Sequence, residues 1–357
     1  MVHLILTADY EIFGNGSGDV RCCLISPTNR LLDVCDKYGA KLTLFFEVCE
    51  YWAFKRAKAE GKLNHLNYDP AAEMAHQAQE AVRRGHDVQL HFHPQWLNSR
   101  IEDGHWKVDF SRWRTSSLDE EDIVGIFRRG KQTLEDLLRS ADPPYRCVAF
   151  RAGALSIQPE DNVLAAMREV GLHADSSVAP GFKSIDGLQS YDYCDVPDKP
   201  LWRVSHSVSE EDLGGALWEI PIATRYVRLW ERDLRTKLWG MMKRTSRFPE
   251  RCCGSFPKTT KSEKRLREKL NILGYLRPKL AMLDISSSRR RISIFLKSAL
   301  NREARYRVYP LVAMGHPKLL ADASGLERFL EWSKKQNTEE LFCFNTFQEF
   351  VALLDNR

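Results

Sequence analysis

Two histidines, His91 and His93, stand one residue apart at the end of an apolar run that Pro94 then interrupts. If residues 87–93 form a strand, alternate side chains share a face, so both imidazoles lie on the same face. Two imidazoles at the end of a strand are suited to bind one divalent metal ion. The alternative is a pair of hydrogen-bonded surface histidines, and the pair by itself does not decide between the two.

Other side chains able to bind metal or move protons also follow apolar runs. They are Asp9 and Glu11 near the start of the chain, then Arg151, Asp175 and His316. If the runs are parallel strands of a barrel, their carboxyl ends meet at one opening, where active sites lie. Carboxylates, imidazoles and a guanidinium in one place are typical of metal-assisted hydrolysis.

The elements that must position these residues alternate between strands and helices. The patterns predict strands over residues 4–9, 41–48, 87–93, 147–153, 173–178, 217–222, 307–314 and 341–345, and helices over 27–38, 70–84, 117–139, 160–170 and 325–336. We expect the helix over 117–139 to begin with a capping box formed by Ser117 and Glu120. The alternation favours an α/β fold with a parallel sheet or barrel.

The composition is that of a globular protein. The 357 residues are 43% hydrophobic, which is enough for a well-buried core. No apolar run reaches the roughly 20 residues of a membrane span, and the first nine residues are too short for a signal sequence. The nine cysteines are odd in number and include no CxxC pair, so neither a disulfide framework nor a cysteine zinc site is indicated. We therefore expect a cytoplasmic location.

Charge is distributed unevenly along the chain. The net charge is +5, but residues 225–307 carry 24 Lys and Arg against 7 Asp and Glu, a balance of +17 that leaves −12 for the rest. Such a block attracts phosphates of nucleic acid or of an anionic membrane. Nucleic acid is disfavoured, because the chain has no recognition motif and no aromatic interleaving in the block.

Part of the block has the pattern of an amphipathic helix with a cationic rim. Its apolar side chains recur at helical spacing, with cations between them: Trp230, Leu234, Leu238 and Met241 beside Arg228, Arg232, Arg235, Lys237, Lys243 and Arg244. The pattern predicts a contact between residues 225–307 and the inner face of a membrane, where a lipid-linked sugar would be found. The alternative is that these residues pack on the barrel or form a homo-oligomer interface.

Taken in order, the motifs resemble the polysaccharide deacetylase (NodB-homology) family, and in particular its WbmS-like branch of surface-polysaccharide biosynthesis. The resemblance rests on five segments: Thr7–Glu11, Gly85–Asp87 with His91–Trp96, Phe150–Gly153, Asp175–Ser177 and Met314–Pro317. It covers residues 1–224 and 305–357 and implies a distorted (β/α)7-type barrel. Residues 225–304 lie outside the pattern, and we expect them to form a basic, mainly helical insertion.

The chain departs from the family pattern at two places. The family has two adjacent aspartates, whereas Tyr10 stands in the second place here and Glu11 is the nearest carboxylate on the face of Asp9. The family's histidines are four residues apart, but the residue four after His91 is Gln95. The ligand set that the resemblance implies is therefore Glu11, His91 and His93 around one divalent ion, expected to be zinc.

The resemblance implies N-deacetylation of an amino sugar in a surface polysaccharide or its precursor. The ion would lower the pKa of a water molecule and polarise the amide carbonyl. Asp9 would act as general base, oriented by Arg151, and His316 would protonate the leaving amine. Asp175 would fix the tautomer of a histidine. Contacts to the N-acetylated sugar are assigned to three further residues: Gln95, Trp96 and Trp113.

Other readings of the same residues stay open. Arg151 and Asp175 can instead form a buried ion pair that joins two strands. The metal site would serve equally well for hydrolysis of another C–N (amide) bond. A rival of another class is a non-catalytic protein that binds sugar phosphates or anionic surfaces through the basic block.

Overall fold

A curved sheet of parallel strands forms the centre of the protein. The computed structural model describes residues 1–185, 187–231, 277–320, 323–336 and 338–355. The parallel strands of its main sheet are β11 (Leu217–Glu219), β7 (Ala174–Asp175), β6 (Ala149–Ala152), β3 (Asp87–Phe92), β2 (Leu42–Glu47), β1 (Val2–Tyr10) and β14 (Tyr309–Ala313), in spatial order. This parallel α/β sheet confirms the predicted fold class.

The two ends of this row of strands meet and close a barrel. Ile222, just beyond β11, pairs in parallel with Val312 of β14, and the Ala223 N–H donates to the Val312 carbonyl at 3.0 Å. The described strands thus form a ring of seven, which the bridge between Ile222 and Val312 closes. Antiparallel β10 (Trp202–Val204) extends the sheet beside β11, and β15 (Phe342–Phe344) pairs with β1.

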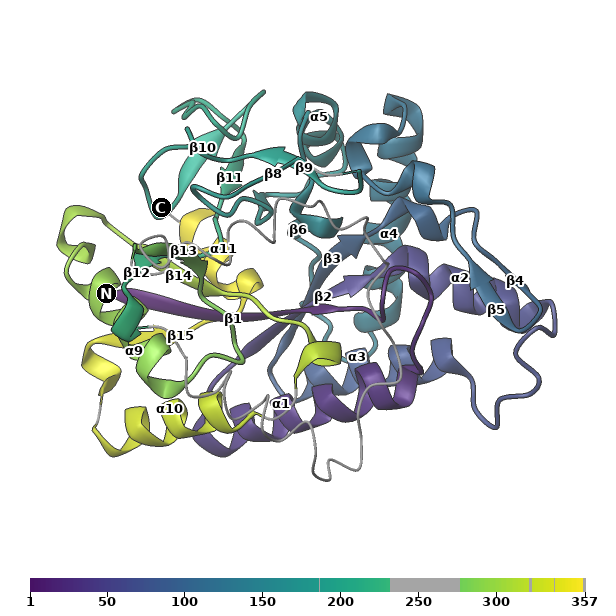
Figure 1. The fold of residues 1–357 in the computed structure, drawn as a ribbon, viewed down its shortest axis with the longest axis horizontal. Helices are drawn as coiled ribbons and strands as arrows, with labels where there is room; N and C mark the ends of the chain where they lie inside the picture. Colours follow the sequence, from purple (N-terminus) through teal and green to yellow (C-terminus); the bar gives the residue numbers. More distant parts are fainter. Residues whose placement is uncertain (186, 232–276, 321–322, 337, 356–357) are drawn as a thin grey trace.

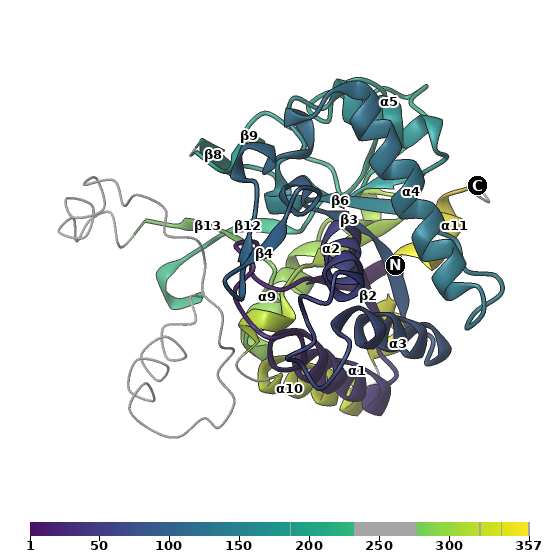
Figure 2. The same ribbon diagram turned by 90° about the vertical axis from the view of Figure 1, so that its right-hand side faces the viewer.

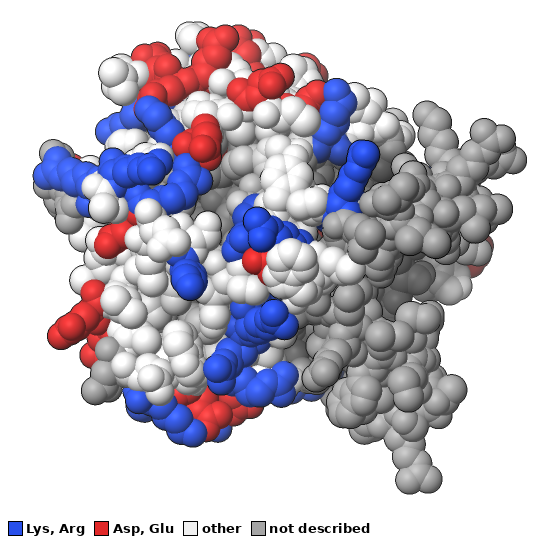
Figure 3. Space-filling view, turned by 60° about the vertical axis from the view of Figure 1, so that its left-hand side comes forward, with Lys and Arg blue, Asp and Glu red and all other residues white. Residues whose placement is uncertain are grey.

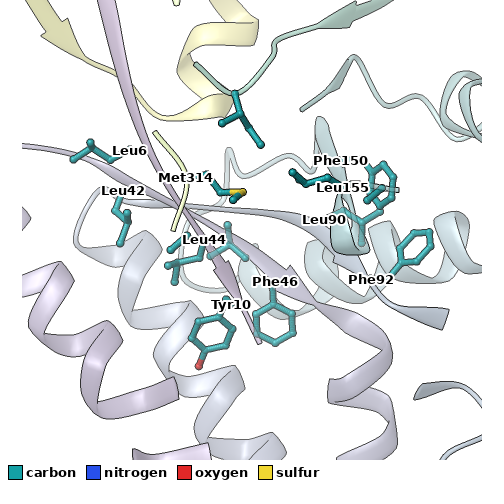
Figure 4. Packing of buried hydrophobic residues seen from close by; sticks show 14 of the residues in the cluster. Leu6, Tyr10, Leu42, Leu44, Phe46, Leu90, Phe92, Phe150, Leu155 and Met314 are labelled. Atoms are coloured by element: carbon teal, nitrogen blue, oxygen red, sulfur yellow. The ribbon is translucent and has the colours of Figure 1, made fainter. Parts of the chain in front are cut away.

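Alternation along the strands produces two apolar layers. On β1, Leu4, Leu6, Ala8 and Tyr10 belong to a large cluster between the barrel and its helices, whereas Ile5 belongs to a separate, smaller one. Figure 4 shows side chains of the larger cluster on neighbouring strands. The smaller cluster fills the barrel interior with residues of several strands: Ile5, Phe45, Ala149, Ala174, Ile220 and Val312.

The helices surround the barrel. They are α1 (Ser26–Tyr38), α2 (Val48–Ala59), α3 (Pro70–Arg83), α4 (Glu120–Leu138), α5 (Asp161–Glu169), α9 (Arg289–Leu300) and α10 (Ser324–Lys335). Figure 2 shows them arranged around the strands, and pairs such as α4 with α5 and α9 with α10 are in contact. None of the described helices is both long and apolar enough to cross a membrane.

A last helix, α11 (Phe347–Asp355), closes the end of the barrel at which the strands begin. Phe347, Phe350, Val351 and Leu354 join the inner apolar cluster. The Phe347 N–H donates to Thr43 Oγ1 at 3.0 Å. Figure 1 shows α11 and both termini on the same side of the molecule. Helix α11 thus covers the inner apolar cluster at the end where the strands begin.

The beginning of α4 differs from the prediction. The helix starts at Glu120, and its N-cap is Asp119, whose carboxylate accepts from the Asp122 N–H at 2.8 Å. Ser117 lies outside the helix and donates its hydroxyl to the Arg114 carbonyl at 2.6 Å. The predicted capping box of Ser117 and Glu120 is therefore wrong, because the aspartate that directly precedes the helix takes the capping position.

Short hairpins and the described parts of the basic block complete the fold. β4 (Arg100–Glu102) pairs with β5 (His105–Lys107), and β8 (Lys183–Ile185) with β9 (Ser190–Asp192). β12 (Thr224–Val227) pairs with antiparallel β13 (Lys279–Met282), after which Asp284 bridges Met314 at the end of β14. Of the predicted amphipathic helix, the residues from Arg232 to Arg244 lie outside the described residues.

Candidate metal centre and catalytic groups

Polar side chains occupy the barrel directly above its inner apolar cluster. The guanidinium of Arg151 on β6 lies over the ring of Phe45, 4.0 Å from its centroid, and marks the boundary. Beyond it, charged residues follow the ends of several strands: Asp9 and Glu11, Glu47, His91 and His93, and His316. The expectation that polar residues at separate strand ends meet is confirmed for Asp9, Glu11, His91, His93, Arg151 and His316 by their mutual contacts.

Arg151 and Asp9 form a buried ion pair across the barrel. Arg151 Nη1 donates to Asp9 Oδ1 at 2.7 Å and to Thr7 Oγ1 at 2.9 Å. Arg151 Nε and Nη2 donate to the carbonyl and hydroxyl of Ser176 at 3.0 and 3.1 Å. Burial opposes ionisation of Asp9, but Arg151, with His91 and His316, outweighs it and lowers the pKa of Asp9. Asp9 is therefore a fixed carboxylate at neutral pH.

Glu11 uses its two carboxylate oxygens differently. Oε1 accepts from Lys318 Nζ at 2.6 Å, and the same ammonium donates to the Ile12 carbonyl at 2.8 Å. Oε2 is buried and has no hydrogen-bond partner among the described residues, although His93 Nδ1 lies 3.0 Å away and His91 Nε2 3.7 Å away. Burial opposes ionisation, but Lys318 and His93 lower the pKa of Glu11 well below its usual value.

His91 is held in one orientation with a free nitrogen. Its Nδ1 lies 2.7 Å from the Arg151 carbonyl, which can only accept, so Nδ1 carries the proton. Nε2 is buried without a hydrogen-bond partner in the described part of the chain and lies 3.7 Å from Glu11 Oε2. A histidine whose Nδ1–H donates to a backbone carbonyl presents its Nε2 in the way that metal-binding histidines do.

His93 lies between two carboxylates. Its Nδ1 donates to Glu47 Oε2 at 2.7 Å and also faces Glu11. Glu47 is the last residue of β2, and its Oε1 accepts from the Cys49 and Glu50 N–H groups at the start of α2. Burial opposes protonation of His93, but the two carboxylates raise its pKa to about 10. The proton on His93 thus supplies positive charge where two buried carboxylates converge.

Four residues offer donor atoms to a single ion. One ligand atom from each of Glu11, Glu47, His91 and His93 lies within 4.8 Å of the others, and all four side chains are buried. Imidazole nitrogen and carboxylate oxygen are ligands that zinc and related divalent ions accept. The unpartnered Glu11 Oε2 and His91 Nε2 belong to this set. The residues therefore fit the expected divalent ion.

His316 stands at the opening of the site. Its Nε2 lies 3.6 Å from Asp9 Oδ2 and 3.6 Å from Glu11 Oε1. With 23% of its side chain exposed, it is more accessible than the other histidines of the site. Partial burial lowers the pKa of His316 and outweighs the opposite effect of Asp9. His316 is thus neutral near pH 7 and next to the Asp9 carboxylate.

Asp175 does not join these residues. It pairs in register with Phe150 and with Glu219, which places it on the other face of the strands from Arg151. Its carboxylate accepts from the Ser177 N–H and hydroxyl at 2.8 and 2.7 Å, and burial raises its pKa. Nδ1 of His91 is held instead by the Arg151 carbonyl, and Nδ1 of His93 by Glu47. The sequence assignment of Asp175 to this role is therefore corrected.

The three proposed sugar contacts differ in position. Trp96 is fully buried, with its ring against Phe54 and Trp106, so no face is left for a sugar. This part of the prediction is wrong because the indole packs in the outer core. Trp113 lies edge-on to His93, 5.7 Å between centroids, and 9% of it is exposed. The Nε1 of Trp113 and Oε1 of Gln95 are buried without hydrogen-bond partners among the described residues.

Two residues of the site were not predicted. Glu47 ends a strand that was recognised, and the rule applied to the other strand ends would have found it. Lys318 follows His316 in a short 3-10 turn and is 7% exposed. No pattern in the sequence indicates that its ammonium turns inward, because a surface lysine after a strand is the ordinary case.

Comparisons with known proteins give similarity only at the level of folds. No family model and no curated protein matches the chain. Among solved structures, a protein described as a polysaccharide deacetylase from Mycobacterium smegmatis aligns at 12% identity and a TM-score of 0.46, over 99% of this chain and 90% of that one. A second protein described as a polysaccharide deacetylase, from Pseudomonas aeruginosa PAO1, aligns at 12% identity and a TM-score of 0.44, over 98% of this chain and 90% of that one. An allantoinase aligns at 12% identity and a TM-score of 0.43, over 98% of this chain and 89% of that one.

Proposed function

We propose that the protein is a divalent-metal-dependent hydrolase that removes an N-acetyl group from an amino sugar of a surface polysaccharide or its precursor. The observation that carries this proposal is the pair of buried atoms Glu11 Oε2 and His91 Nε2, which have no hydrogen-bond partner among the described residues and lie 3.7 Å apart beside the Asp9–Arg151 pair. In this proposal the protein is a member of the polysaccharide deacetylase superfamily, which its motif order resembles.

Glu11, His91 and His93 would hold the ion, which is expected to be zinc. When bound, such an ion supplies a Lewis acid that polarises an amide carbonyl and activates water near neutral pH. Asp9 acts as the general base. Its lowered pKa keeps it ionised, and Arg151 fixes Oδ1 at 2.7 Å and leaves Oδ2 toward His316.

His316 completes the transfer of the proton to the leaving amine. It is 3.6 Å from Asp9 Oδ2, so a proton taken up by Asp9 has a neutral imidazole beside it. Because burial lowers the pKa of His316, the imidazole begins the cycle unprotonated and receives its proton from the reaction. Protonated His316 at the opening can then pass this proton to the amine nitrogen.

The sugar would contact the site beside His93. Trp113 stacks on the half-exposed Phe110, 5.5 Å between centroids, and offers its Nε1–H as a donor. Gln95 is fully buried, as Trp96 is, so it is not kept as a sugar contact. A donor next to aromatic rings suits a polar, ring-shaped substrate such as an N-acetylated amino sugar.

Two measurements on the purified protein test the proposal. We expect protein prepared without chelator to contain about one divalent ion per chain by elemental analysis. We also expect it to release acetate from an N-acetylated sugar nucleotide or lipid-linked sugar, and to lose this activity after chelation. Stoichiometric metal without acetate release, but with ring opening of a small cyclic amide, would instead indicate another C–N hydrolase. Protein without bound metal would rule out the proposal.

We further propose that the basic block places the enzyme at the cytoplasmic face of a membrane, near a lipid-linked sugar. Described residues that support it include Trp230 and Tyr226, exposed at 62% and 64% on the β12 side of the block. On the face shown in Figure 3, the described lysine and arginine side chains form several separate groups. Sedimentation with anionic and neutral vesicles at low salt tests this part, and equal recovery in both supernatants would contradict it.

A further inference from the structure

We propose that Glu47 is a fourth protein ligand of the ion, bound through Oε2, and that His93 binds the same ion through Nδ1. This inference rests on the metal site of the proposed function. The sequence motifs do not point to Glu47, which comes from the end of β2 and not from the segments that carry the family resemblance. It would make the site a set of two histidines and two glutamates.

The orientation of His93 decides which of its nitrogens faces the ion. A face of the ring lies against Gly153, where a Cβ atom would lie 2.5 Å from Cδ2, 2.7 Å from Cγ and 2.8 Å from Nε2. Nδ1 lies 2.7 Å from Glu47 Oε2 and 3.0 Å from Glu11 Oε2, an oxygen that has no hydrogen-bond partner among the described residues. Of the two ring nitrogens, Nδ1 is therefore the one directed at the donor atoms of the other ligands.

The same nitrogen is the hydrogen-bond donor to Glu47. Nδ1 lies 2.7 Å from Glu47 Oε2, and Glu47 is fully buried. A nitrogen that binds a metal ion has no proton left to donate. Glu47 Oε2 would then be a buried carboxylate oxygen without a partner, which is strongly unfavourable. An ion in contact with Nδ1 removes this penalty if Glu47 Oε2 binds it as well.

The distances between donor atoms agree with a shared ion. His93 Nδ1 lies 2.7 Å from Glu47 Oε2 and 3.0 Å from Glu11 Oε2, and His91 Nε2 lies 3.7 Å from Glu11 Oε2. One ligand atom from each of the four residues lies within 4.8 Å of the others. Ligands about 2.0–2.1 Å from a tetrahedral zinc ion are about 3.3 Å from one another. The donor atoms thus need shifts of only a few tenths of an ångström for these three pairs.

Backbone contacts hold Glu47 in place. Oε1 accepts from the N–H groups of Cys49 and Glu50 at 2.8 and 3.3 Å, which leaves Oε2 directed at His93. One carboxylate thus caps helix α2 and reaches the ion site. With two glutamates, the protein ligands would neutralise the charge of a divalent ion.

Glu47→Gln tests the inference with Co²⁺ as the probe. The amide oxygen of glutamine can still cap α2, but the side chain loses the anionic donor. We expect the visible absorption spectrum of the Co²⁺-loaded protein to change, because its intensity and position depend on the ligands of the ion. We also expect the dissociation constant for Co²⁺ to rise by about 100-fold or more, at or beyond the upper end of the effect of an outer-shell partner.

Glu50→Gln is the matched control. Glu50 lies in the first turn of the same helix, is fully buried, and accepts from the Ile12 N–H, outside the donor cluster. Glutamine keeps the shape of this side chain and an oxygen that can accept from the Ile12 N–H. We expect this variant to keep the spectrum and Co²⁺ affinity of the wild-type protein.

The outcomes separate this inference from the proposed function. A Glu47→Gln variant that binds Co²⁺ more weakly with an unchanged spectrum would overturn the inference and leave the metal hydrolase in place, with Glu47 only orienting His93. Wild-type protein that binds no Co²⁺ would overturn both. If Glu47→Gln fails to fold, a crystal structure of the Zn²⁺-loaded wild-type protein decides. A distance of about 2.0–2.2 Å between Glu47 Oε2 and the ion supports the inference. Glu47 Oε2 at hydrogen-bond distance from His93 Nδ1 and out of contact with the ion refutes it.

Discussion

Replacing Asp9 with asparagine should lower kcat for acetate release by about 100-fold or more while the metal content stays unchanged. The amide oxygen of the introduced asparagine can still accept from Arg151 Nη1, which lies 2.7 Å from Asp9 Oδ1, so the barrel contact is preserved. The amide cannot take up a proton, however. Because Arg151 keeps the pKa of Asp9 low against the effect of burial, the wild-type carboxylate is ionised and available as a base.

A control on the same rim of the barrel separates catalysis from general disturbance. Asp284 bridges Met314 next to the site, but its carboxylate accepts from the Ser286 N–H at 2.7 Å and not from a residue of the cluster. Asp284→Asn should retain most of the activity. Acetate release and bound metal are measured on the same preparations. Loss of metal from Asp9→Asn would make Asp9 a ligand and contradict its assignment as the base.

The arrangement of the strand ends could be predicted because it depends on local patterns. Apolar runs followed by Asp9, His91, Arg151 and His316 are visible in the sequence, and parallel strands bring their carboxyl ends together. The closing bridge between Ile222 and Val312 could not be predicted in the same way. It depends on where two distant segments meet, and one pair of residues leaves no pattern.

Asp175 shows that a position at the end of a predicted strand does not tell on which face of the sheet the side chain lies. Its place after an apolar run is right, but its face is set by the register with Phe150 and Glu219, which a run of two strand residues does not reveal. Trp96 was misjudged for a similar reason. It follows the histidine pair directly, yet the turn at residues 94–96 directs it into the core beside Phe54. The position of Trp96 next to the histidines in the sequence therefore did not predict the direction of its side chain.

Lys318 was beyond prediction for a different reason. Its ammonium donates to Glu11 Oε1 at 2.6 Å, and the two residues are 307 positions apart in the sequence. Neither residue has a sequence signature for the other. The pair matters because it occupies one oxygen of Glu11 and leaves Oε2 toward the histidines. The ligand geometry therefore depends on a residue that composition and spacing cannot identify.

Replacing Arg151 with methionine should lower the free energy of unfolding by about 3–5 kcal/mol, which is typical when one partner of a buried ion pair is removed. Arg151 is fully buried and joins β1 to β7 by bonds to Asp9, Thr7 and Ser176. Methionine fills much of the volume but leaves the Asp9 carboxylate without its counter-ion. Lysine keeps the charge but not the planar guanidinium. The free energy of unfolding of Arg151→Lys should therefore lie between those of the wild-type protein and Arg151→Met.

Urea unfolding of a double-mutant cycle checks the cause of this loss. If the uncompensated Asp9 charge is responsible, adding Asp9→Asn to Arg151→Met should restore part of the stability, because the buried charge is then gone. If the double variant loses as much as the sum of the two single variants, the ion pair is not the source. A change below about 1 kcal/mol for Arg151→Met would contradict the prediction, since it would mean that Asp9 finds another partner or takes up a proton.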